Sequence, residues 1–183
     1  GTLLVLAGSL EYAGAALLSG LGAARSGAGL VCVASCESVV QRLSGLVPEL
    51  IAMPLAEEAP GLISPAGWRR GATESAAYDA LVVGPGLGRQ GGTLRRTRGL
   101  IGELDRPAVI DADGLNALAA EQRWWRSLGA PLVLTPHPVE FARLARTDPP
   151  ADDEARAAAA AAEAERWGCV VVLKGANTVV AGP

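Results

Sequence analysis

The sequence has few aromatic residues, a single lysine and no apolar run long enough to cross a membrane. Four Trp, two Tyr and one Phe are all its aromatic residues, so a buried core has to be built mainly from Ala, Val and Leu. The net charge of −3 provides no positive field that would attract nucleic acid or anionic lipid. We therefore expect no nucleic-acid partner and no membrane partner.

The cysteines are too few for a disulfide framework and lack the paired spacing of a zinc site. Cys32, Cys36 and Cys169 are odd in number, and two of them lie in or beside apolar runs. A reduced, buried thiol is the expected state of such residues. Because reduced thiols are typical of the cytoplasm, we predict a cytoplasmic protein.

The position of the only lysine is informative because the chain otherwise uses arginine. A lysine is most distinct from an arginine where a compact point charge meets a phosphate. Glycine next to it permits close approach of the backbone, and a threonine adds a hydroxyl. These residues form a candidate nucleotide contact: Lys174, Gly175, Ala176, Asn177 and Thr178. A surface turn between two strands is the alternative interpretation.

Short apolar runs alternate with helical segments along the whole chain, which predicts one α/β domain over residues 1–183. We expect a mostly parallel sheet covered by helices on both faces. Residues 54–71 contain Pro and Gly and are expected to be irregular or to include a short extra element. The strands are predicted at residues 3–6, 30–34, 50–53, 80–83, 108–110, 132–134 and 170–173, and 177–181 is a further candidate.

The only histidine, His137, lies between two prolines just after the run 132–134. Prolines end a strand because they have no N–H to donate, and Thr135 or His137 can then cap the following helix. Ligands of open α/β sheets bind beyond the carboxyl ends of the strands. We expect the side chains of His137 and Glu140 to face that crevice, unless they only complete a loop.

A glycine-rich stretch follows the run 80–83. Residues 86–91 fit the pattern G-x-G-x-x-G, and Asp111 lies about twenty residues further on, as in dinucleotide-binding folds. Pro85 and the position of this unit, fourth among the strands, argue against that interpretation. A plain turn, or a glycine-lined wall on which a flat ligand packs, would produce the same sequence.

Two carboxylates, Asp111 and Asp113, follow the run 108–110. Asp113 could cap a helix, or either residue could act directly in a site. Together with Glu140 they could also hold Mg²⁺ through water, because hard cations prefer oxygen ligands.

Six motifs in matching order resemble the ADP- or ATP-dependent NAD(P)H-hydrate dehydratases of the ribokinase-like superfamily. The resemblance implies a three-layer α/β/α fold with a mostly parallel central sheet. The motifs are Gly8-Ser9 with Tyr12–Ala16, Arg25–Val31, Val83–Gly88, Ile110–Asn116, Leu134–Pro138 with Glu140, and Val172–Ala176.

The resemblance also implies an activity. These enzymes use ADP or ATP, with Mg²⁺, to restore NADH or NADPH from a hydrated form that has lost its reducing function. By resemblance, Ala15, Gly86 and His137 contact the hydrate, and residues 174–178 lie along the nucleotide. Glu140 is a candidate for organising Mg²⁺ and water, and a homo-oligomer is expected.

The chain departs from the family pattern in two places. Val139 stands where the family usually has glycine. The glycine-rich G-T-G-D stretch, which carries the expected catalytic aspartate, would lie beyond Pro183, so we expect this chain to be C-terminally incomplete. Three alternatives stay open: a vitamin-type kinase of the same fold, a non-catalytic nucleotide-binding subunit, and a Rossmann dehydrogenase.

Overall fold

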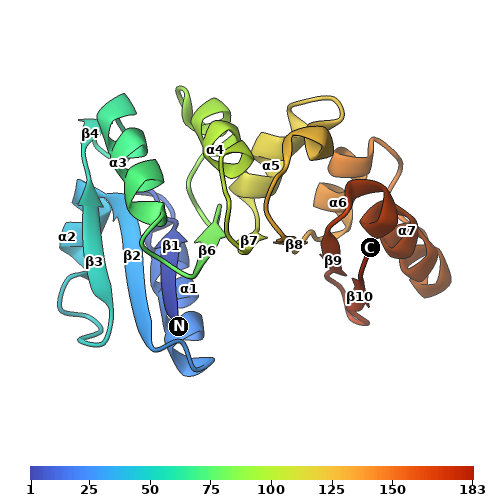
Figure 1. Cartoon of the computed structure of the whole chain (residues 1–183), viewed down its shortest axis with the longest axis horizontal. Coiled ribbons are helices and arrows are strands. Elements are labelled where there is room, and N and C mark those ends of the chain that lie inside the picture. The colour runs from blue at the N-terminus through green and yellow to red at the C-terminus, as the bar shows by residue number, and fades with distance from the viewer.

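A computed structural model describes residues 1–183 as an eight-stranded sheet flanked by helices (Figure 1). All neighbouring strands of this sheet are parallel except β9 and β10, which confirms the predicted mostly parallel sheet. Its strands are β1 (Thr2–Leu6), β2 (Leu30–Cys36), β3 (Ile51–Leu55), β6 (Ala80–Val83), β7 (Ala108–Ile110), β8 (Leu132–Leu134), β9 (Val170–Leu173) and β10 (Val179–Ala181).

The helices lie on the two faces of the sheet and bury two separate cores. The larger core joins the sheet to α3–α7, and the smaller one lies between α1 and strands β1 and β2. Beside α1, the short α2 packs on β2 and β3. The helices are α1 (Ala13–Arg25), α2 (Glu37–Leu43), α3 (Pro65–Ser75), α4 (Thr93–Gly102), α5 (Asp113–Ala119), α6 (Pro138–Ala145) and α7 (Asp153–Trp167), with a 3₁₀ helix at Trp124–Ser127.

The scarce aromatic residues gather in one part of the larger core. The rings of Trp124 and Trp167 have centroids 4.9 Å apart, and Phe141 lies 5.7 Å from Trp167. Such tilted pairs stabilise a core beyond their simple burial. Elsewhere the core consists mostly of Leu, Val, Ile and Ala, as the composition predicts.

The second face of the sheet is less completely covered over β6–β8. Residues that point toward α3–α7, such as Leu81 and Ile110, are fully buried. The alternate residues Val82, Val109 and Val133 are only partly buried. Helices therefore cover this face most fully where α1 and α2 lie.

The segment after β3 contains more regular structure than the sequence led us to expect. A hairpin of β4 (Glu57–Ala59) and β5 (Leu62–Ile63) is followed directly by α3, which is eleven residues long. Ser64 caps α3 by accepting the N–H of Gly67, and proline at the first helical position needs no donor. Pro and Gly here shape turns and a helix start. The short hairpin is the extra element that the sequence analysis allowed for, whereas the helix α3 was not predicted.

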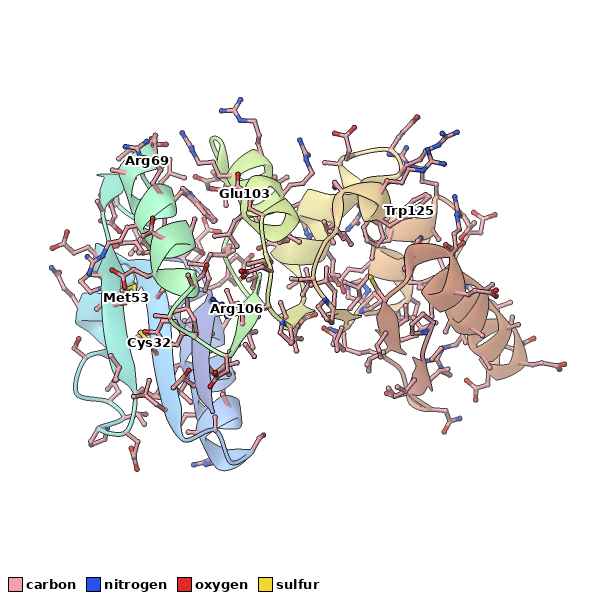
Figure 2. All side chains as sticks on the ribbon, viewed as in Figure 1. Cys32, Met53, Arg69, Glu103, Arg106 and Trp125 are labelled. Carbon is pink, nitrogen blue, oxygen red and sulfur yellow. The ribbon has the colours of Figure 1, made fainter.

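All three cysteines are free and buried, as predicted. Figure 2 shows Cys32 with Met53 on the neighbouring strands β2 and β3. Burial raises the pKa of Cys32 and Cys36 above the usual thiol value, and raises the pKa of Cys169 to about 11. These thiols are therefore poor nucleophiles. No helix of the structure combines the length and apolar character needed to span a bilayer.

Candidate functional site

The strand order reverses at the paired strands β1 and β6, and a crevice lies beyond their carboxyl ends. The sheet runs β10-β9-β8-β7-β6-β1-β2-β3, so the chain first builds β1, β2 and β3 in one direction (Figure 1). It then returns to the other side of β1 and builds β6 to β10 in the opposite direction. The segments after β1 and β6 lead to α1 and α4 on opposite faces of the sheet, and such a switch point is where open α/β sheets bind ligands.

A pocket of about 730 Å³ lies at this point. Its walls come from the loop after β1 and the start of α1, the glycine-rich loop after β6, the tip of the β4–β5 hairpin, and the segment after β7. Its volume is within the range of small-molecule and cofactor sites. Its lining includes Tyr12, Ala15, Gly61, Gly86, Gly88 and Asp113.

The glycine-rich loop packs directly against the start of α1. A Cβ on Gly86 would lie 2.6 Å from Cβ of Tyr12 and 2.8 Å from Cβ of Ala15. The backbone of Gly86 also has a positive φ of 65°. The structure thus brings together Ala15 and Gly86, two of the predicted hydrate contacts, and favours the glycine-lined wall among the interpretations of this loop.

Asp113 holds the glycine-rich loop in place. Its nearly buried carboxylate accepts hydrogen bonds from the N–H of Gly88 (2.9 Å), from Nε of Arg89 (3.0 Å) and from Nδ2 of Asn116 (3.1 Å). Asp113 is the first residue of α5 and not its N-cap, so the capping role was wrong. The residue before it, Ala112, has φ 49° and ψ −112°, a strained conformation of a kind that occurs mostly at functional sites.

His137 and Glu140 begin α6 through reciprocal hydrogen bonds. Nδ1 of His137 accepts the N–H groups of Val139 (3.2 Å) and Glu140 (3.3 Å), and Oε2 of Glu140 accepts the N–H of His137 (2.9 Å). The predicted cap by His137 is confirmed. Both side chains are turned toward the first helical turn; the Glu140 side chain is buried, whereas that of His137 is half exposed. His137 lies outside the lining of the pocket.

The acidic residues do not form a cluster that could hold a metal by protein ligands alone. No group of three His, Cys, Asp or Glu side chains converges anywhere in the chain. Glu140 has one carboxylate oxygen bonded to its own helix start, and Asp111 is paired with a lysine. Mg²⁺ usually takes one or two carboxylates plus phosphate oxygens and water, so this chain fits Mg²⁺ only together with a bound phosphate.

Lys174 lies at the end of β9 and reaches across the end of β8. Its Nζ is 2.7 Å from Oδ1 of Asp111, at the end of β7, and its N–H donates to the carbonyl oxygen of Pro136. Both charged side chains are partly exposed. The three neighbouring strand ends are thereby linked at the same edge of the sheet as the pocket.

The residues after Lys174 form a tight turn into β10. The Thr178 hydroxyl donates to the carbonyl oxygen of Gly175 (3.1 Å) and accepts its N–H (3.4 Å). Asn177 donates through Nδ2 to the Asp153 carboxylate at the start of α7. The turn is therefore fixed at both ends, and Ala176 lies exposed at its middle.

Several residues of this edge were missed or misread in the sequence. Asp152 and Arg156 have the i, i+4 spacing of a helical ion pair, but Asp152 caps α7 and Arg156 pairs with Asp153 at 2.9 Å. The hairpin wall and the hydrogen bonds of Arg156 to the Leu173 and Lys174 carbonyl oxygens depend on contacts between separate segments. No local pattern could have revealed them.

Glu57 fixes the hairpin tip that forms one wall of the pocket. One oxygen of its carboxylate accepts the hydroxyl and N–H of Ser38 and the N–H of Gly61. Partial burial alone would raise the pKa of Glu57, but these hydrogen bonds outweigh burial and lower it. The stabilisation is therefore complete above the ordinary carboxyl pKa and is lost as the pH falls through the lowered value.

We expect Glu57→Gln to lower the free energy of unfolding by about 1–2 kcal/mol at neutral pH, because an amide replaces a charged acceptor. It should also flatten the loss of stability between about pH 5 and pH 3, since the titrating group is gone. Urea unfolding across this range tests both effects. Glu58→Gln is the matched control, because Glu58 makes only a 3.8 Å ion pair with Arg96. Equal pH curves for Glu57→Gln and the unsubstituted chain would contradict this role.

Comparison with known proteins identifies similar chains along the whole sequence. The profile of the NAD(P)H-hydrate dehydratase family (Carb_kinase) matches residues 3–183. The bifunctional NAD(P)H-hydrate repair enzyme Nnr of Salinibacter ruber is 43% identical over 190 residues, which cover 100% of this chain and 34% of that protein. The chain thus spans about a third of the length of this relative.

Solved structures show the same fold. The ADP/ATP-dependent NAD(P)H-hydrate dehydratase of Bacillus subtilis, co-crystallised with ATP/Mg²⁺ and soaked with CoA, matches with a TM-score of 0.79 and 34% identity. The match covers 100% of this chain and 62% of that one. A ribokinase-like superfamily protein of Enterococcus faecalis, 20% identical, has a TM-score of 0.79 over 100% of this chain and 60% of its own. The predicted ribokinase-like fold is confirmed.

Proposed function

Because the chain belongs to the NAD(P)H-hydrate dehydratase family, we propose that it provides the substrate pocket and a nucleotide contact of an enzyme that uses ADP or ATP to return hydrated NADH or NADPH to NAD(P)H. The observation that carries this proposal is the pocket between β1 and β6. There the chain brings Ala15 and Gly86 into contact range, as expected of the residues that hold the hydrate.

The proposed reaction needs positioning more than covalent chemistry. A hydroxyl on the hydrated ring is a poor leaving group, and phosphoryl transfer from the nucleotide converts it into a phosphate ester. The lone pair of the ring nitrogen then expels phosphate as the C–O bond breaks, and loss of a proton from the neighbouring ring carbon restores the double bond. Gly86 offers bare backbone against which a flat ring can pack, and Lys174 offers a point charge to phosphate oxygens. Mg²⁺, held chiefly by phosphate oxygens, would neutralise charge on the nucleotide.

The cellular location, the oligomeric state and the preferred nucleotide are part of this proposal. Three buried, reduced thiols support the proposed cytoplasmic location. A homo-oligomer follows from the resemblance alone. Turnover measured separately with ADP and with ATP would show which nucleotide is preferred.

We expect hydrated NADH, incubated with the natural full-length protein, Mg²⁺ and either nucleotide, to regain the absorbance of reduced nicotinamide. Because this chain spans only part of its relatives, binding of the hydrate to the 183-residue chain is measured in parallel by calorimetry. A phosphorylated product without return of the absorbance would identify a kinase instead. Absence of both hydrate binding and turnover would refute the proposed function.

Gly86→Ala should weaken hydrate binding by at least about tenfold, because the added methyl would occupy the contact with Tyr12 and Ala15. Gly88→Ala is the matched control. It lies in the same loop with a similar positive φ of 80°, but its Cβ would meet nothing closer than 3.9 Å. If both variants lose the same affinity, strain in the loop and not the wall at Gly86 determines binding.

A further inference from the structure

We propose that Arg156 is a positioning residue for the nucleotide, because its buried guanidinium holds the turn of residues 174–178 in the conformation that presents Lys174 to a phosphate. This inference rests on the proposed function, in which that turn contacts ADP or ATP. Arg156 itself belongs to α7 and is 8% exposed. It therefore acts through the turn and not by touching the nucleotide.

Three hydrogen bonds fix the guanidinium between α7 and the end of β9. Nη2 donates to the carbonyl oxygens of Leu173 (3.2 Å) and Lys174 (3.1 Å), and Nη1 donates to Oδ1 of Asp153 (2.9 Å). Two consecutive carbonyl groups at the strand end are thus bound by one planar cation. Hydrogen bonds from a charged donor are stronger than neutral ones, so this contact defines the backbone on both sides of Lys174.

Gly175 shows how closely the guanidinium packs on the turn. A Cβ at this position would lie 2.2 Å from Nη2, 2.6 Å from Cζ and 2.7 Å from Nη1 of Arg156. Arg156 cannot move aside without breaking its hydrogen bonds to Leu173 and Lys174. The glycine is therefore required by the arginine, and φ at Gly175 does not itself demand it.

The first turn of α7 also holds the far end of the same turn. Asp153 accepts hydrogen bonds from Arg156 and from Nδ2 of Asn177 through its two oxygens. Arg156 and Asp153 together bind the turn before and after Gly175. On its other side, Lys174 is directed toward Asp111, so its ammonium group is free of Arg156 and available at the edge of the sheet.

The test measures ADP binding and hydrate binding to the 183-residue chain by calorimetry. We expect Arg156→Met to weaken ADP binding by at least about tenfold, since a charged donor to both carbonyls is lost, and to leave hydrate binding unchanged. Arg156→Lys should recover part of the ADP affinity, because one ammonium group can replace only part of the planar fork. Arg166→Ala is the control: Arg166 lies on the same helix and pairs with Glu163, but is half exposed.

Gly175→Ala tests the same contact with Arg156 retained. If Arg156→Met does not fold, Gly175→Ala alone is the test: it should weaken ADP binding and leave hydrate binding unchanged, and equal losses of both would refute the inference. If Arg156→Met folds, the two variants are also combined. Gly175→Ala should weaken ADP binding strongly in the unsubstituted chain and hardly at all in the Arg156→Met background, because the atoms that the methyl would meet are then absent. Additive losses in the double variant would overturn the proposed coupling.

The outcomes separate this inference from the proposed function. If Arg156→Met binds ADP normally while Lys174→Met does not, the positioning role is refuted and the nucleotide contact stands. If Arg156→Met lowers ADP and hydrate binding equally, Arg156 is only a structural residue and the inference is refuted. If the unsubstituted chain binds hydrate but no ADP, the nucleotide part of the proposed function fails and this inference fails with it.

Discussion

Gly84→Ala is expected to lower the free energy of unfolding by about 3–5 kcal/mol, a large effect for one added methyl group. Gly84 directly follows β6 and has φ 125°, a conformation that residues with a side chain rarely adopt. Its Cβ would lie 1.9 Å from the carbonyl oxygen of Asp111 and 2.6 Å from the N–H nitrogen of Gly114. Both neighbours are backbone atoms at the end of β7 and the start of α5, so neither can rotate away.

The same clash should also disturb the pocket, because Asp111 and Gly114 flank the segment that holds the glycine-rich loop. Urea unfolding and hydrate binding measure the two effects. Gly99→Ala is the matched control: Gly99 lies exposed within α4, its Cβ would meet no atom within 4 Å, and alanine there should stabilise the protein by about 0.5–1 kcal/mol. A loss below about 1 kcal/mol for Gly84→Ala would mean that β6, β7 and α5 are less tightly joined than the structure has them.

Lys174→Met is expected to weaken ADP binding by about 10- to 100-fold while changing the free energy of unfolding by less than about 1 kcal/mol. The large loss of ADP affinity is expected because the substitution removes the only lysine, whose point charge is directed to the shared edge of β7, β8 and β9. The change in the free energy of unfolding is small because the ion pair is partly exposed: 41% of the Lys174 side chain and 29% of the Asp111 side chain are accessible to solvent. Partly exposed ion pairs contribute little to stability because water and salt screen them.

Calorimetric titration with ADP and urea unfolding test these two quantities on the same samples. Arg98→Met removes the same charge from a distant ion pair with Glu121 and should change neither quantity appreciably. The ADP affinity of the unsubstituted chain should fall as salt is added, and that dependence should be weaker in Lys174→Met. Matching losses of ADP affinity and stability would instead favour a surface turn without a nucleotide role.

The site consists of two parts that share one edge of the sheet. The pocket between β1 and β6 holds Ala15 and Gly86, and the turn after β9 holds Lys174. Asp111 and Asp113 lie between them, the first paired with Lys174 and the second with the glycine-rich loop. In the proposed function, a hydrate in the pocket and a nucleotide on the turn would both lie next to these two carboxylates.

The sequence by itself determined the features that depend on neighbouring residues. Apolar runs bounded by Gly and Pro located the strands of the main sheet, and the Pro136–Glu140 stretch located the start of α6 with His137 as its cap. Such features depend on hydrogen bonds and periodicity within a few residues. The order of the six motifs also indicated the family, by resemblance.

Only the tertiary structure decided which of these strand ends meet. The order of the strands placed β6 beside β1 and so formed the pocket, and the packing of α7 on β9 brought Arg156 onto the turn that carries Lys174. Lys174 and Asp111 are 63 residues apart, and Glu57 meets Ser38 across 19 residues. Contacts at such separations depend on how the whole chain packs its apolar faces, and no local pattern specifies them.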